Sequence, residues 1–261
     1  MQNKECCTPQ KNRINYQKEL EKLLASLEAE RISGNGKKKR LLLHACCAPC
    51  SSYVLEYLRE KFDITVLYYN PNITEREEYE KRSAELKRLA RQMNEESAGA
   101  GQPEKGSVPT EPAALPSGFI LVEEGEWEPQ RFFEVSKGLE NLPEGGERCF
   151  RCYELRLRET ARIAAERGFD YFTTTLTISP LKNAEKLNEI GALMAEEYGV
   201  AFLPSDFKKK NGYKRSVELS EKYGLYRQDY CGCIFSRAER DRRKADGQPT
   251  DAVTVLRKAE L

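Results

Sequence analysis

Short apolar runs alternate with longer charged segments along most of the chain. Runs of strand length occur at residues 41–44, 64–69, 119–122, 171–176 and 200–203. Segments with apolar residues at helical spacing occur at 14–31, 51–61, 74–93, 128–138, 148–167, 182–198 and 213–223, and we expect Thr74 to cap the third. Because strands that alternate with helices form parallel βαβ units, we predict an α/β fold with a Rossmann-like, mostly parallel sheet.

The same pattern predicts how the chain is organised. Residues 1–37 comprise an N-terminal tail and one helix, residues 38–244 form a single α/β domain, and residues 245–261 form a C-terminal tail. Residues 95–118 interrupt the pattern with four Gly, four Pro and no aromatic residue. Such a segment buries too little apolar area to offset its ordering entropy, so we predict a disordered insertion within the domain.

Composition narrows the class of protein. The chain has 43 Lys+Arg against 42 Asp+Glu, a net charge of +1, which argues against a uniformly basic nucleic-acid binder. The mean hydropathy is −0.71, and no apolar run approaches the roughly 18 residues that a membrane helix needs. The first residues are polar and do not resemble a secretory signal. We therefore expect a soluble, cytoplasmic protein with no membrane association.

One region departs from this even balance of charge. Residues 205–244 contain twelve Lys and Arg against six Asp and Glu. Basic residues interleaved with tyrosines suit contact with phosphates and stacking on bases. A solvated basic face explains the composition equally well, but the position beside Cys231 and Cys233 favours RNA binding.

The nine cysteines fall in tight groups rather than being spread along the chain. The groups are Cys6-Cys7, Cys46-Cys47-x-x-Cys50, Cys149-x-x-Cys152 and Cys231-x-Cys233. In a reducing cytosol such grouping indicates metal or redox chemistry. The first pair lies in the predicted N-terminal tail, and we assign it no role.

The spacing within the other groups is chemically specific. The first strand is followed directly by Cys46, Cys47 and Cys50, at the carboxyl edge of the sheet where α/β proteins usually bind ligands. The CxxC pair places two sulfurs on one helix face. The CxC pair is too close for an ordinary disulfide, which suits an easily reduced redox pair or two thiolates on one metal.

Counting ligands separates the kinds of metal site. The three groups supply seven thiols, whereas one zinc ion uses four and a [4Fe–4S] cluster uses three or four. The remaining thiols would form a redox pair or bind a second metal. His44 is the only histidine, so a Cys2His2 finger is excluded, and no NAD(P) or P-loop motif occurs. An iron–sulfur redox site is therefore favoured.

Taken together, several blocks resemble the QueH-type epoxyqueuosine reductases. They lie at residues 41–52, 69–73 with 78–79, 148–156, 174–180 and 205–236, and they keep the family's order over about residues 38–240. The resemblance implies a HUP or pyrophosphate-loop-like arrangement with a Cys-rich metal site at the carboxyl edge of the sheet. It implies a tRNA substrate carrying epoxyqueuosine at the anticodon wobble position, reduced to queuosine in the last step of queuosine biosynthesis. The electron donor is unknown.

The resemblance also implies roles for the cysteines. Cys46, Cys47, Cys149 and Cys152 would hold a [4Fe–4S] cluster, and the reaction would need no cobalamin. Cys231 and Cys233 would form a redox-active pair or, with Cys50, bind an iron beside the cluster.

For the remaining site residues we hypothesise the following. The candidate acids that protonate the departing oxygen are Tyr230 and Asp229, which flank the CxC pair, and His44, which flanks the double cysteine. Tyr230 is our first choice. We expect contacts with phosphates or with the modified base from Ser51, Ser52, Lys182 and Arg215.

Two other functions are compatible with parts of the pattern. One is an ATP-dependent, iron–sulfur tRNA thiolase of the pyrophosphate-loop type, against which the missing glycine-rich loop argues. The other is a non-enzymatic zinc module that binds RNA.

Overall fold

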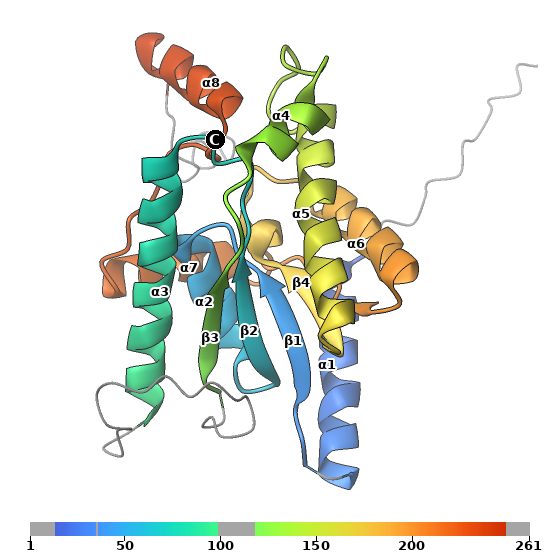
Figure 1. Ribbon diagram of the computed structural model, residues 1–261. Helices are drawn as coiled ribbons and strands as arrows, with labels where there is room; N and C mark the ends of the chain where they lie inside the picture. Colours follow the sequence, from blue (N-terminus) through green and yellow to red (C-terminus); the bar gives the residue numbers. More distant parts are fainter. Residues whose placement is uncertain (1–13, 35, 99–117, 249–261) are drawn as a thin grey trace, which may run out of the picture.

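The computed structural model describes residues 14–34, 36–98 and 118–248 (Figure 1). In chain order the elements are α1 (Tyr16–Ser33), β1 (Lys39–His44), α2 (Ala48–Leu58), β2 (Phe62–Tyr68), α3 (Arg76–Ala98), β3 (Ile120–Glu124), α4 (Pro129–Ser136), α5 (Glu147–Glu166), β4 (Tyr171–Thr174), the 3-10 helix η2 (Thr175–Ile178), α6 (Ala184–Tyr198), β5 (Ala201–Phe202), α7 (Gly212–Lys222) and α8 (Ile234–Ala245). Apart from η2 and α8, every element corresponds to a predicted one.

The sheet confirms the predicted α/β fold. Its five strands lie in the order β3-β2-β1-β4-β5, and every neighbouring pair is parallel. Leu42 at its centre pairs with Thr65 of β2 and with Phe172 of β4. The strand order reverses between β1 and β4, so the loops that follow these two strands diverge and leave a crevice where α/β proteins bind ligands. The HUP-like arrangement stays a prediction.

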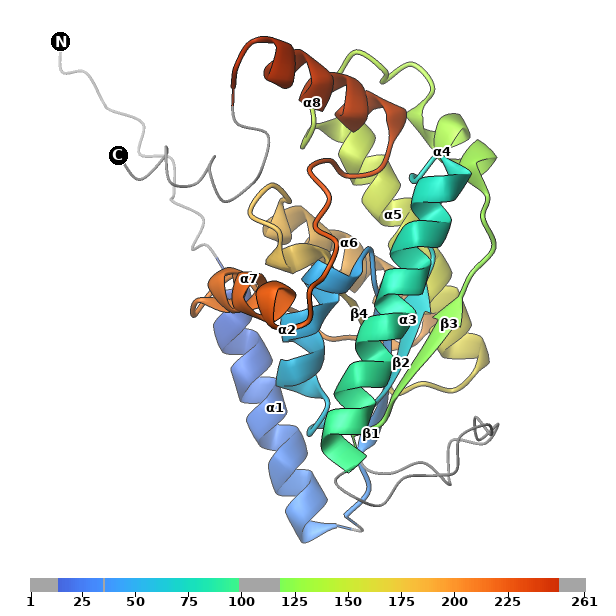
Figure 2. The ribbon, with the colours of Figure 1, turned by 90° about the vertical axis from the view of Figure 1, so that its left-hand side faces the viewer.

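Successive residues of the central strands point into two different cores. Leu41 and Leu43 pack in the core under α1, α2, α3 and α7, whereas Leu42 packs in the core under α5 and α6. Figure 2 shows the first group of helices in front of the strands and α5 and α6 behind them. Because both faces are covered, β1 reads as a continuous apolar run rather than as an alternating one.

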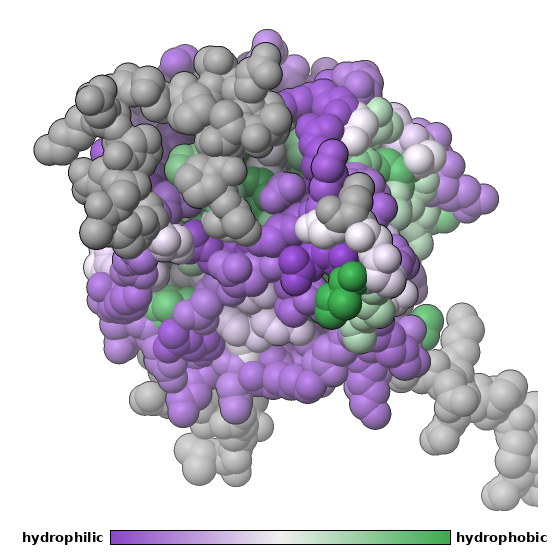
Figure 3. All heavy atoms as spheres, turned by 90° about the horizontal axis from the view of Figure 1, so that it is seen from below, coloured by the Kyte–Doolittle hydropathy of each residue, from purple (hydrophilic) through white to green (hydrophobic). Residues whose placement is uncertain are grey.

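The carboxyl ends of the strands point to the end of the molecule where α4 and α8 lie (Figure 1). These two helices touch through Phe132 and Phe235, whose ring centroids lie 6.1 Å apart. The opposite end, seen in Figure 3, is covered mainly by hydrophilic residues with scattered hydrophobic ones among the described residues in view.

Three local predictions were wrong. Helix α2 begins at Ala48 instead of residue 51, because Cys47 is its N-cap and Pro49 fits the first turn. Residues 95–98 of the predicted insertion belong to α3, where the Asn94 side chain exchanges two hydrogen bonds with the main chain of Ile120. Thr74 does not cap α3. The helix begins two residues later, at Arg76, and the hydroxyl of Thr74 has no hydrogen-bond partner.

Other predictions concern segments outside the described residues. Residues 99–117 of the insertion, Cys6 and Cys7, and residues 249–261 of the C-terminal tail are among them. The domain boundary at residue 38 stays a prediction. In the described part of the chain, no helix is both long and apolar enough to span a bilayer.

Helix α1 packs on the domain through its apolar stripe. Leu20 is fully buried and Leu24 is nearly so, in the same core as β1 and α2. The predicted helix of the N-terminal segment therefore contributes to the main core.

We expect the substitution Leu20→Ala to lower the free energy of unfolding by about 2–5 kcal/mol, because it leaves a cavity in that core. The matched control is Ile32→Ala on the same helix, where 76% of the residue is exposed and little should change. Urea unfolding measures both, and equal effects of the two substitutions would contradict the packing of α1.

Candidate metal centre

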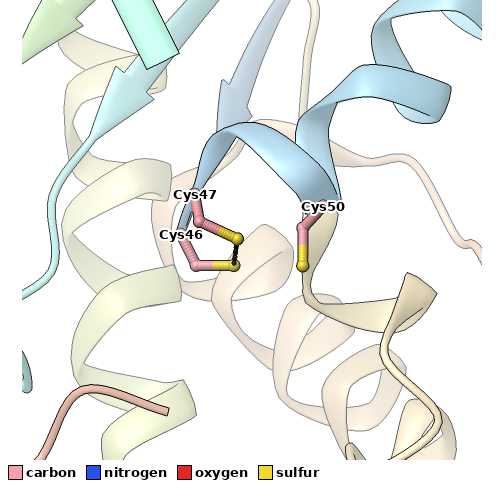
Figure 4. A group of neighbouring side chains, drawn as sticks. All are labelled: Cys46, Cys47 and Cys50. Atoms are coloured by element: carbon pink, nitrogen blue, oxygen red, sulfur yellow. Dashed lines mark hydrogen bonds between the residues drawn. The ribbon is translucent and has the colours of Figure 1, made fainter. Parts of the chain in front are cut away.

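Three sulfur atoms converge in the turn between β1 and α2. Cys46 and Cys47 lie in the turn, and Cys50 lies in the first turn of the helix. The Sγ atoms of the first two are 3.6 Å apart, and all three Sγ atoms lie within 4.8 Å of one another (Figure 4). Two sulfurs on one tetrahedral ion with bonds of about 2.3 Å lie about 3.8 Å apart, so this group has a spacing that metals use.

The three thiols do not ionise alike. Hydrogen bonds from Cys46 and Cys50 hold the pKa of Cys47 well below its usual range. The hydrogen bond between Cys46 and Cys47 raises the pKa of Cys46 to about 11. Hydrogen bonds with Cys46 and Cys47 raise the pKa of Cys50. Cys47 is thus the first thiolate of the group, and a bound metal ion would displace the other protons.

Two cavities adjoin at this edge of the sheet. The four other cysteines line the second of them. Cys149 and Cys152 reach it from α5, and Cys231 and Cys233 reach it from the loop before α8. Cys231 also lines the first cavity, together with Cys46 and Cys50. The structure therefore brings all three predicted groups to the carboxyl edge of the sheet. In the described chain, only the group in the β1–α2 turn places three or more potential metal ligands within 4.8 Å of one another.

The CxC loop needs its glycine. Gly232 has φ +121°, a conformation that other residues rarely adopt, and a Cβ there would lie 2.8 Å from a side-chain carbon of Ile73. Its carbonyl oxygen accepts a hydrogen bond from the Thr74 amide at 3.4 Å. This close approach to the segment before α3 positions Cys231 and Cys233 over the sheet edge.

The second cavity contains polar atoms without partners. Nη2 of Arg156, the hydroxyl of Tyr153 and Oδ1 of Asn72 are buried and have no hydrogen-bond partner, and all three residues line this cavity. Each unpartnered buried polar group costs about 1–3 kcal/mol. Two of the three are hydrogen-bond donors, so the cavity suits an occupant that accepts hydrogen bonds.

Two buried arginines donate hydrogen bonds to the main chain beside the cysteines. Arg82 of α3 donates to the carbonyls of Cys231 at 3.0 Å and Tyr230 at 3.4 Å, and its charge is balanced by Glu78. Arg156 of α5 donates from Nε to the carbonyl of Cys152 at 3.3 Å.

Arg156 also reaches the loop after β2. Its Nη1 donates to Oδ1 of Asn70 at 3.4 Å, and the side-chain Nδ2 of Asn70 donates to the carbonyl of Ala45 at 2.8 Å. This chain of hydrogen bonds connects the CxxC helix to the turn that carries Cys46 and Cys47.

His44 anchors the end of β1. It is fully buried, with Nδ1 2.8 Å from the Thr174 hydroxyl and Nε2 3.1 Å from the Tyr69 carbonyl oxygen. Burial lowers its pKa to about 3, so the ring is neutral at physiological pH. The histidine therefore holds β1, β2 and β4 together behind the cysteines and is unsuited to donate a proton.

The first cavity has a basic, aromatic rim. Its lining includes Tyr213, Arg227, Tyr230, Arg240 and Arg243. The guanidinium carbons of Arg82 and Arg240 lie 5.2 Å and 4.8 Å from the centroid of the Tyr230 ring. Burial raises the pKa of Tyr230, so its hydroxyl stays protonated at neutral pH.

Lys182 lines both cavities and forms a buried ion pair with Glu144 at 2.7 Å. Burial opposes the charge on this lysine, but electrostatic attraction to Cys231 and Glu144 outweighs the effect of burial. The pKa of Lys182 therefore lies well above its usual value. A permanent positive charge therefore lies between the two cavities.

The remaining predicted residues have other partners. Asp229 is paired with Arg240 and with Lys244. Although burial opposes the charge, these partners hold the pKa of Asp229 below its usual range, so this carboxylate has no proton to donate at neutral pH. It attaches α8 to the CxC loop instead.

The two serines and Arg215 are not among the residues that line either cavity. Ser51 and Ser52 are fully buried and donate to the carbonyls of Cys47 and Pro49, which stabilises the first turn of α2. This use of the hydroxyls removes the basis for a substrate contact. Arg215 lies on the surface, paired with Glu56 and Glu218, and its contact with substrate stays a prediction.

Sequence reasoning missed several residues of the site. They are Asn72, Arg82, Glu144, Tyr153 and Arg156. For Arg156 a signal existed, because it follows Cys152 by four residues and so shares its helix face. Nothing local distinguishes Arg82 or Glu144 from an exposed charge.

Comparison with known proteins identifies the family of this chain. The profile of the family described as Epoxyqueuosine reductase QueH matches residues 41–239, which include all seven cysteines of the site. The chain is 39% identical over 224 residues to epoxyqueuosine reductase QueH of Streptococcus pyogenes, covering 86% of this chain and 78% of that protein. It is 38% identical over 226 residues to the Staphylococcus epidermidis protein of that name, covering 86% and 85%.

A relative of the same name from Thermotoga maritima is 34% identical over 209 residues, covering 79% of this chain and 94% of that protein. The family match at residues 41–239 includes every residue that lines the second cavity, and all those that line the first except Arg240 and Arg243. The chain belongs to the QueH family of epoxyqueuosine reductases.

Proposed function

We propose that this chain reduces epoxyqueuosine at the wobble position of tRNA to queuosine, the last step of queuosine biosynthesis. The observation that carries the proposal is the gathering of seven cysteines at the sheet edge beside a cavity with a basic, aromatic rim. The reaction consumes two electrons and two protons. An external reductant supplies the electrons one at a time. It converts the epoxide into a carbon–carbon double bond and releases the oxygen as water. Because the substrate is tRNA, we place the reaction in the cytoplasm.

We propose a [4Fe–4S] cluster as the resident cofactor, with Cys46, Cys47, Cys149 and Cys152 as its ligands. The fit is supported by the thiol-rich donor set and by the unpartnered donors of the second cavity, since cluster sulfurs accept hydrogen bonds. Cys231 and Cys233 would then act as a redox pair or, with Cys50, hold an adjacent iron. When bound, these groups supply one-electron transfer and a Lewis acid for the epoxide oxygen.

The chain's own residues supply the proton and the substrate contacts. Tyr230 is the proposed donor, because it lines the first cavity and stays protonated at neutral pH. The guanidiniums of Arg82 and Arg240 lie close to its ring and would stabilise the phenolate that remains after proton transfer. The rest of the rim, including Arg227 and Arg243, would contact tRNA phosphates.

The first test is metal content and turnover of protein purified without oxygen. We expect about four irons with matching sulfide and a broad absorbance near 400 nm. Dithionite should then drive conversion of epoxyqueuosine-tRNA without ATP. Stoichiometric zinc without sulfide would contradict the cluster and favour the zinc module, and a requirement for ATP would favour the thiolase.

Replacing a proposed cluster ligand should remove cofactor and activity together. For Cys149→Ala we expect loss of the iron absorbance and of turnover, with the circular dichroism spectrum retained. The matched control is Arg151→Ala on the same helix. The side chain of Arg151 is 56% exposed, so this variant should keep the iron absorbance and the turnover. A Cys149→Ala variant with full iron content and normal turnover would overturn this ligand assignment.

The proton donor is tested by Tyr230→Phe, which keeps the ring beside Arg82 and Arg240 and removes only the hydroxyl. We expect turnover to fall by about 10²–10⁴-fold while iron content stays unchanged, as for loss of a general acid. Single-turnover kinetics measure the effect. Tyr226→Phe is the control, because that hydroxyl lies 3.3 Å from Glu78 and outside the cavity lining. Equal rates for the two variants would exclude Tyr230 as the donor.

A further inference from the structure

Most buried cations around the cysteines have a carboxylate partner. Arg82 pairs with Glu78 at 2.7 Å, Arg148 with Glu239 at 3.1 Å, and Lys182 with Glu144 at 2.7 Å. Each of these charges is therefore balanced before any metal binds.

Arg156 is different. Only 1% of the residue is exposed, and within the described residues no carboxylate pairs with it. Its Nε and Nη1 donate to neutral oxygens of Cys152 and Asn70. Its Nη2 has no partner and belongs to a side chain that lines the cavity of the four cysteines.

A buried charge without a counter-charge is strongly unfavourable, so Arg156 requires an anion nearby. The candidates in reach are sulfurs. Burial opposes the charge on Arg156, yet the thiols of Cys152, Cys231 and Cys46 together keep its pKa above the usual value. These thiols belong to all three cysteine groups, so the guanidinium interacts electrostatically with each group rather than with a single ligand.

We propose that Arg156 is a positioning residue that supplies the permanent counter-charge of the cysteine-held metal centre and raises its reduction potential. One-electron reduction adds a negative charge to the centre, and a fixed cation in a low-dielectric cavity stabilises that reduced form. Nη2 is the free donor for a sulfur of the centre. The proposal rests on the proposed function, because it takes the centre to be an iron–sulfur site.

The test is the midpoint potential of iron-loaded protein, measured by anaerobic redox titration with absorbance or electron paramagnetic resonance detection. Arg156→Gln removes the charge and keeps hydrogen-bonding capacity, and its potential should shift to a more negative value. Arg156→Lys keeps the charge and should stay near the wild-type potential. Arg158→Gln is the matched control, since it makes the same charge change on the surface of α5, where Arg158 pairs with Glu154, and it should not shift.

The outcomes separate this inference from the function on which it rests. Wild-type protein without iron would refute the cofactor, and this inference with it. An iron-loaded Arg156→Gln protein with an unchanged potential would refute only the role of Arg156. If that variant does not retain iron, Arg156→Lys decides: iron retained at near wild-type potential supports the charge, whereas iron lost in both variants assigns Arg156 to hydrogen bonding alone.

Discussion

Seven thiols from three distant segments share one end of the sheet, and their ionised forms repel one another in a buried, low-dielectric setting. The positive charge that offsets this repulsion comes from side chains that are themselves buried. Arg82 and Arg156 both donate to the main chain beside the thiols, Arg82 to the carbonyl of Cys231 and Arg156 to that of Cys152. Because Glu78 balances the charge of Arg82, the counter-charge that we propose for the thiols comes from Arg156.

The sheet topology explains why these segments meet. Cys46 follows β1 at the point where the strand order reverses, and Thr175 follows β4 on the other side of that point. The Cys46 amide reaches the Thr175 hydroxyl at 3.5 Å. Helix α5 and the loop before α8 then bring the other cysteines over this crevice. Two adjoining cavities result, one rich in sulfur and one with a basic rim, joined through Cys231 and the Lys182–Glu144 pair.

Much of the site was predictable because its signals are local. Three cysteine groups, their places at element ends and their family resemblance follow from short stretches of sequence. The serines were misjudged for the opposite reason: Ser51 and Ser52 stand beside Cys50, but Pro49 starts the helix early and turns their hydroxyls to its carbonyls. Helix α8 was missed because its dense positive charge hides the apolar contact of Phe235.

By itself, the sequence determined the α/β alternation, the parallel sheet and the grouping of the thiols, because periodicity and spacing are properties of neighbouring residues. Only the tertiary structure decided which charges are buried and what balances them. Arg156 and Arg158 lie two residues apart on one helix, yet one faces sulfur and the other faces solvent and Glu154. Burial depends on segments that pack from far along the chain, so no local pattern separates the two.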